Sequence, residues 1–105
     1  MDTTKPMITL IQSSIFSEWL SNLADKKGKA NIFNRLRNAS LGNFGDCEPV
    51  GEGVSEMRIH YGPGYRVYFI RSELTVYVLL CGGDKSSQPK DIKKAKRMAL
   101  DLKGS

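Results

Sequence analysis

The stretch that decides the fold reads IHYGPGYRVYF, from Ile59 to Phe69, and it joins two aromatic-rich runs through a Gly-Pro-Gly turn. Side chains alternate across a β-strand, so residues of equal parity share a face of the sheet. The odd positions of the two runs are all apolar or aromatic: Met57, Ile59, Tyr61, Tyr65, Val67 and Phe69. The even positions are Arg58, His60, Arg66 and Tyr68. The alternation predicts a β-hairpin with one core face and one polar face.

The length of the turn predicts how the two strands pair. A loop of three residues would pair Tyr61 with Tyr65, His60 with Arg66, Ile59 with Val67, and Arg58 with Tyr68. A slip by one residue would bury unpaired arginines among aromatic side chains, at a cost of several kcal/mol. The predicted register therefore gathers the four polar side chains within a patch about 10 Å across.

Before the hairpin, the sequence predicts a strand and two helices. Met7 to Ile11 is a short β-prone run. Apolar residues recur at helical spacing from Phe16 to Leu23 and from Ile32 to Ala39, and the connection is short, so we expect an antiparallel helical hairpin. Leu41 to Gly53 is rich in glycine and predicts a loop, in which Cys47 to Val50 could pair briefly.

After the hairpin, Leu74 to Cys81 is nearly all apolar, as in a strand covered on both faces. Pro89 stands in the first turn of a last helix, whose outer face is basic. The predicted order is β-α-α-β-β-β-α. We expect one α+β domain over residues 1–105, with an antiparallel four-stranded sheet packed on an N-terminal helical hairpin and a flexible lead-in at about residues 1–6.

The composition favours an anionic partner. Lysine and arginine number 16 against 11 aspartate and glutamate, and the formal charge is +5. Such a balance is typical of proteins that bind nucleic acid, a ribosome or an acidic protein, and also of basic domains that bind none of these. Two cysteines without CxxC spacing and a single histidine predict no metal and no other cofactor. Because no apolar run has the length of a signal peptide or a membrane span, we expect a cytoplasmic protein without a membrane partner.

The polar face of the hairpin has two interpretations. Antiparallel sheets often have a solvated outer face, which usually mixes Thr, Ser, Glu and Lys. This face instead carries two arginines, a histidine and a tyrosine, and Lys85 follows the next strand. Arginine binds phosphate through two parallel hydrogen bonds, and tyrosine and histidine can stack on a base or transfer protons. The composition favours a site for an anion or RNA.

Four motifs in this order resemble the RelE/ParE toxin superfamily, above all its HigB-like, phage-derived "addiction module killer" branch. The motifs are GNxGD (Gly42 to Asp46), VGxGVxExRI (Val50 to Ile59), GPGYRVYF (Gly62 to Phe69) and LLxGGDKxxQxxDI (Leu79 to Ile92). The resemblance covers most of the chain, from about Phe16 to the C-terminus. It implies a toxin of a type II toxin-antitoxin system, held silent by an antitoxin with a HigA-like helix-turn-helix fold.

The resemblance also implies the activity. Such a toxin is an mRNA interferase: a metal-independent endoribonuclease that cleaves mRNA on translating ribosomes through attack by the 2′-OH and so inhibits translation. Arg66 and Lys85 match the residues that contact the scissile phosphate, and the predicted register places Arg58 beside them. His60 is a candidate for acid or base, because histidine transfers protons near neutral pH. Several RelE-like nucleases use a tyrosine near the C-terminus; since no tyrosine follows Tyr77 here, Tyr68 on the cationic face could substitute for it.

Further cations lie outside this cluster. Arg35 and Arg37 on the second helix, and the basic face of the last helix, could contact ribosomal RNA, or could be solvated helix surface. Two other functions stay open. The same superfamily contains ParE-like toxins that poison DNA gyrase by protein binding, and a small basic domain could bind an acidic partner through its sheet face. The clustering of Arg58, Arg66 and Lys85 favours the nuclease, since a gyrase binder needs no such cluster.

Overall fold

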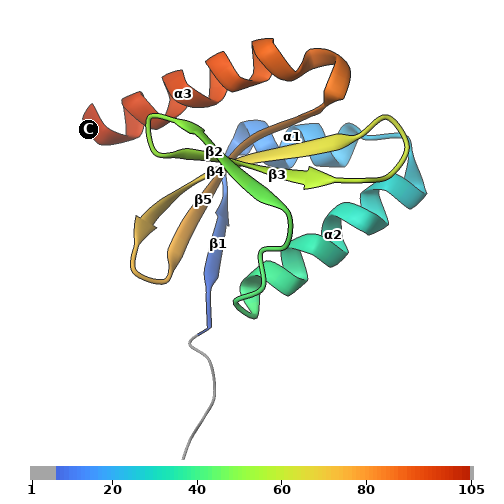
Figure 1. Cartoon of the computed structure of the whole chain (residues 1–105), viewed down its shortest axis with the longest axis horizontal. Helices are drawn as coiled ribbons and strands as arrows, with labels where there is room; N and C mark the ends of the chain where they lie inside the picture. Colours follow the sequence, from blue (N-terminus) through green and yellow to red (C-terminus); the bar gives the residue numbers. More distant parts are fainter. Residues whose placement is uncertain (1–6, 105) are drawn as a thin grey trace, which may run out of the picture.

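Five strands and three helices follow one another in the computed structural model, which describes residues 7–104 (Figure 1). Their bounds are β1 Thr9–Gln12, α1 Ser14–Asn22, α2 Lys26–Ser40, β2 Cys47–Gly51, β3 Val54–Ile59, β4 Tyr65–Glu73, β5 Val76–Asp84 and α3 Gln88–Gly104, with a short 3₁₀ turn at Lys85–Ser87 before α3. The predicted α+β class is confirmed. The predicted lead-in at residues 1–6 lies outside the described residues.

The strands form one mixed sheet in the order β1-β5-β4-β3-β2. β1 pairs with β5 in parallel, and the other neighbours are antiparallel. The prediction of four antiparallel strands is therefore wrong in two respects: the sheet has five strands, and β1 runs parallel to β5. The sequence of a strand as short as β1 does not show whether it pairs in parallel. The sequence of β2 contains Pro49 and Gly51, which are typical of a loop, and it therefore predicts one.

The hairpin of β3 and β4 has a longer turn than predicted. Ile59 pairs with Tyr65, and Arg58 pairs with Arg66. Residues 60–64 form the connection, in which Gly62 and Gly64 have φ of 56° and 80°. The predicted pairs are wrong by two residues, because five residues rather than three make the turn. A shift of two keeps every side chain on its predicted face, so the separation of odd from even positions is confirmed.

Each face of the sheet has its own core, and helices α1 and α2 cover the odd face. Phe16 and Leu20 of α1, and Ile32 of α2, pack with Met57 and Val67 in one buried cluster. Helix α1 contacts mainly β5, whereas α2 contacts β1 and β3. The two helices thus follow each other as predicted, but their main contacts are with the sheet, so the prediction of a packed helical hairpin is only partly matched.

Helix α3 covers the even face on the opposite side of the sheet (Figure 1). Ala95 and Ala99 pack against Val54, Tyr68 and Leu80 in a second buried cluster. The expectation that the even face points away from the core is wrong for this part of the sheet. Helical spacing already marks Ala95 and Ala99 as part of a buried stripe, but it does not show which face of the sheet the helix covers.

Hydrogen bonds from side chains fix where the first two helices begin. Ser13 Oγ accepts from the backbone N–H of Phe16 at 3.0 Å and donates to the Leu80 carbonyl at 2.6 Å, which ties α1 to β5. Asp25 accepts from the N–H of Gly28 at 2.9 Å and from the Tyr65 hydroxyl at 2.7 Å, which ties α2 to β4. The hydrogen bond to Gly28 and, next, that from Tyr65 lower the pKa of Asp25.

Candidate functional site

A cleft of about 360 Å³ opens at the turn end of the β3–β4 hairpin. Its lining residues are His60, Tyr61, Gly62, Pro63, Gly64, Arg66 and Lys85. Lys85 follows directly on β5, and a Cβ atom on Gly64 would lie 3.4 Å from the Cβ of Lys85, so this lysine lies against the hairpin turn. The structure thus brings together three of the predicted site residues, His60, Arg66 and Lys85.

Arg66 is the deepest cation of the cleft. It lies in β4 and is 8% exposed. Its Nε is buried and has no hydrogen-bond partner among residues 7–104. A buried donor without a partner costs about 1–3 kcal/mol. Because Arg66 also lines the cleft, an anion that enters it can pair with the guanidinium.

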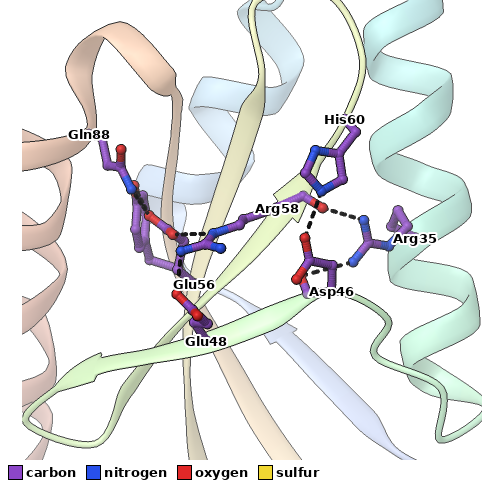
Figure 2. A network of polar contacts seen from close by, with 8 residues as sticks. Arg35, Asp46, Glu48, Glu56, Arg58, His60 and Gln88 are labelled. Carbon is purple, nitrogen blue, oxygen red and sulfur yellow. Dashed lines mark hydrogen bonds and ion pairs between the residues drawn. The ribbon is translucent and has the colours of Figure 1, made fainter.

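Arg58 lies opposite Arg66 in the sheet but is already paired with acids (Figure 2). Its Nε donates to Glu56 at 3.0 Å, and a terminal nitrogen forms an ion pair with Glu48. The hydrogen bond to Glu56 raises the pKa of the Arg58 guanidinium. The sequence suggested that Arg58 acts beside Arg66 and Lys85 on the phosphate. In the structure, two carboxylates already pair with its charge.

Glu56 organises a buried network next to the arginines (Figure 2). It is fully buried, and besides Arg58 it accepts hydrogen bonds from the Tyr68 hydroxyl at 3.0 Å and Gln88 Nε2 at 2.8 Å. Burial raises the pKa of Glu56, but the hydrogen bonds from Arg58, Gln88 and Tyr68 together outweigh it and lower the pKa overall. Glu56 is therefore an anion inside the protein.

Tyr68 belongs to this interior network. Its side chain is completely buried, and burial, followed by the charge of Glu56, raises the pKa of its hydroxyl. The sequence suggested that Tyr68 could stack on a base or assist catalysis. In the structure it lies under α3, where no RNA base reaches it.

His60 lies just past the end of β3 and contacts Asp46. Its Nε2 donates to Asp46 Oδ2 at 2.6 Å, and the two side chains are 71% and 46% exposed. The hydrogen bond from His60 is the largest cause that lowers the pKa of Asp46. Because one ring nitrogen is used in this bond, the other can form a hydrogen bond with a ligand in the cleft.

Arg35 holds the loop that carries Asp46. Its guanidinium donates to the Phe44 carbonyl at 3.0 Å. It also donates to the carbonyls of Asp46, at 3.3 Å, and of Arg58 (Figure 2). The sequence suggested that Arg35 binds RNA, but these three carbonyls take up three of its five N–H donors. Arg37, the other cation suggested on α2, is exposed at the surface of the helix.

Sequence reasoning singled out neither Asp46, Glu56 nor Gln88. Each of them nevertheless stands at a fixed letter of the motifs GNxGD, VGxGVxExRI and LLxGGDKxxQxxDI. The parity of β3 also places Glu56 on the same face as Arg58, two residues along the strand. A search for carboxylates beside the arginines would have found Glu56.

Other kinds of site find little support in the described part of the chain. No three His, Cys, Asp or Glu side chains of residues 7–104 are grouped so that they could hold a metal ion. Cys47 and Cys81 are free, and burial raises the pKa of the Cys81 thiol to about 12. None of the helices described has the length and the apolar composition needed to cross a membrane.

These features define an α+β protein whose mixed sheet carries a cleft with an arginine, a lysine and a histidine at one end. The chain is 48% identical over 87 residues to an uncharacterized protein of Haemophilus influenzae (strain ATCC 51907 / DSM 11121 / KW20 / Rd), and the match covers 83% of this chain and 88% of that protein. The chain belongs to the same family as this Haemophilus protein. No family model matches the chain.

Proposed function

We propose that this protein is a HigB-like toxin of the RelE/ParE superfamily that inhibits translation by cleaving mRNA on the ribosome. The observation that carries the proposal is Arg66, whose buried Nε has no acceptor within residues 7–104 and which lines a cleft together with Lys85 and His60. A phosphate group in the cleft would meet two cations and a proton acceptor at once.

The proposed reaction uses the 2′-OH of the RNA as nucleophile. The Nε2 of His60 carries the proton shared with Asp46, so Nδ1 takes the proton from the 2′-OH. The 2′-oxygen then bonds to phosphorus while the bond from phosphorus to the 5′-oxygen breaks. The 5′-oxygen takes a proton from water, which reaches the cleft because His60 is 71% exposed, and the hydroxide that remains takes the proton from Nδ1 of His60. The products are a 2′,3′-cyclic phosphate and a free 5′-OH.

Arg66 and Lys85 stabilise the charge that develops on the phosphate during this reaction. The fork of a guanidinium matches two phosphate oxygens, and the buried position of Arg66 strengthens the interaction. Arg58 plays a different part in the proposal: with its ion pairs to Glu48 and Glu56 it shapes the sheet face beside Arg66.

Induction in a bacterial host tests the proposal against the gyrase alternative. We expect new 5′ ends within codons of translated messages, no such ends with Arg66→Ala, and unchanged plasmid supercoiling. Arg71→Ala is the matched control, because Arg71 lies in the same strand but is exposed and far along it from the cleft. Intact messages together with loss of supercoiling would favour a ParE-like toxin.

The proposed function includes a partner and a compartment. A toxin that acts on ribosomes works in the cytoplasm, and its producer survives only if an antitoxin binds it. We propose that the antitoxin is a HigA-like helix-turn-helix protein. Co-expression tests this: the chain should copurify with that protein in a stable complex, and growth should recover. Unchanged toxicity in its presence would exclude it as the antitoxin.

A further inference from the structure

An apolar groove runs beside α3, and it shares no lining residue with the cleft at Arg66. It has about 600 Å³ of space. Its floor includes Val78 and Leu80 of β5 and Ile11 of β1, which pairs with Val78, and Ile15 and Met98 line its sides. Ile11 is 48% exposed and Ile15 is 38% exposed. The groove therefore leaves apolar side chains in water, which is typical of an interaction surface.

The sheet has this groove because α3 does not cover its whole width. The main contacts of the helix are with β5, β4 and β3, and any contact that it makes with the edge strand β1 is minor. The strip over β5 and β1 is left without a covering layer, although a sheet face with apolar residues is stable only when covered. A second helix packed at the usual spacing of about 8–10 Å from α3 would fill this strip.

One wall of the groove is strongly basic. Lys90, Lys93, Lys94 and Arg97 of α3 line an adjoining groove of about 680 Å³, which shares Ile15, Met98 and one acid, Asp101, with the apolar one. Their spacing is i, i+3, i+4 and i+7, so they form one stripe along the helix. None of these four forms a salt bridge with a residue of the range 7–104.

We propose that this combined groove binds one acidic amphipathic helix of a partner protein, lying alongside α3. Its apolar face would cover Ile11, Val78 and Met98, and glutamate or aspartate on its flank would pair with the basic stripe. A nucleic acid would contact the lysines but leave the apolar floor exposed. A second copy of this chain fits less well, because each copy has a charge of +5 and would bring its own cations.

A designed helical peptide tests this inference independently of any cleavage activity. The probe is a peptide of about four turns with leucine at i, i+3, i+4 and i+7 and glutamate on the flanks, and a second peptide carries lysine in place of glutamate. NMR titration of the labelled full chain should show shifts at Ile11, Ile15, Val78 and Met98 with the acidic peptide and none with the basic one.

Charge reversal in the basic stripe of α3 shows how much these residues contribute to peptide binding. The variant Lys93→Glu/Lys94→Glu/Arg97→Glu should weaken binding of the acidic peptide roughly tenfold or more. The matched control Lys26→Glu/Lys27→Glu/Arg37→Glu has the same net charge but changes exposed residues of α2, and it should bind like the wild type. Ile15→Ser should weaken binding without unfolding the chain, since Ile15 is partly exposed.

Several results would overturn the inference. One is the absence of shifts at millimolar peptide; another is equal binding of the acidic and basic peptides. Shifts of the groove residues that depend on the concentration of the protein alone would assign the groove to a second copy. If deletion of residues 1–6 were needed before the peptide could bind, the groove would belong to the chain's own N-terminal segment.

Discussion

Arg58 of β3 and Arg66 of β4 are paired across the two strands, but their hydrogen-bond partners differ. Arg58 has Glu48 and Glu56 beside it, whereas the Nε of Arg66 has no acceptor in the described chain. A buried unpaired donor lowers stability, and such a cost persists where a ligand completes the site. The residue that destabilises the free protein is thus the one we assign to the phosphate.

Replacement of Arg66 should separate stability from activity. We expect Arg66→Met to leave the free energy of unfolding within about 1 kcal/mol of wild type or to raise it, because an unpaired buried donor is replaced by an apolar side chain. Urea denaturation measures this. Arg58→Met should lower stability clearly, since it removes a hydrogen bond from the buried Glu56. Equal losses in the two variants would contradict the difference that we draw between them.

The buried Glu56 predicts a dependence of stability on pH. Its pKa is lowered in the folded protein, since hydrogen bonds outweigh burial. Its contribution is therefore present above the ordinary carboxyl pKa of 4.5 and is lost as the pH falls through the lower folded pKa. Urea denaturation from about pH 6 to pH 3 should show a shallower decline for Glu56→Gln than for wild type. Identical declines would show that the Glu56 network contributes nothing.

At the scale of the elements, two glycines of β5 let helices approach from both sides. A Cβ on Gly82 would lie 2.4 Å from the ring of Trp19 in α1, and a Cβ on Gly83 would lie 1.9 Å from Oδ2 of Asp91 in α3. Gly83 also pairs with Arg66 in the sheet. The GGDK part of the sequence thus sets how closely both layers pack around the strand that leads to Lys85.

An added methyl group at Gly83 should disturb this packing. We expect Gly83→Ala to lower the free energy of unfolding by about 1–3 kcal/mol, because the Asp91 side chain must move. Thermal denaturation gives the measurement. Gly104→Ala is the control, since a Cβ there meets no atom within 4 Å, and it should change stability little. A Gly83→Ala protein as stable as wild type would show that α3 shifts at no cost.

The loop before β2 positions His60 through Asp46. Asp46→Asn should lower the cleavage rate on the order of tenfold, because an amide holds the imidazole less firmly than a carboxylate does and no longer fixes its tautomer. A time course of primer extension on translating ribosomes measures this rate. An unchanged rate would remove the pair of His60 and Asp46 from the mechanism.

The elements show which features a sequence can predict. The helices and the hairpin were predictable because their apolar periods are local, and parity placed each hairpin residue on the correct face. The register was not, because loop geometry depends on Gly62 and Gly64 adopting positive φ. The direction of β1 and the packing of α3 depend on contacts between distant segments, such as Ile11 with Val78.

At the scale of the whole molecule, the two proposed surfaces share no lining residue. The cleft at Arg66 lies at the turn end of β3 and β4, and the apolar groove lies along β1 and α3. For the cleft, sequence reasoning singled out Arg66, Lys85 and His60. It missed the acids that pair with Arg58 and His60, because alternation shows which face a side chain occupies and not which partner it finds there.

Cleavage of mRNA by purified translating ribosomes tests the central claim most directly. The measurement is primer extension on one message with wild type, Arg66→Ala and the control Arg71→Ala. We predict the same new 5′ ends, within codons, with wild type and Arg71→Ala, and none with Arg66→Ala. Equal cleavage by folded Arg66→Ala, or no cleavage by wild type, would contradict the assignment of this cleft as a ribonuclease site.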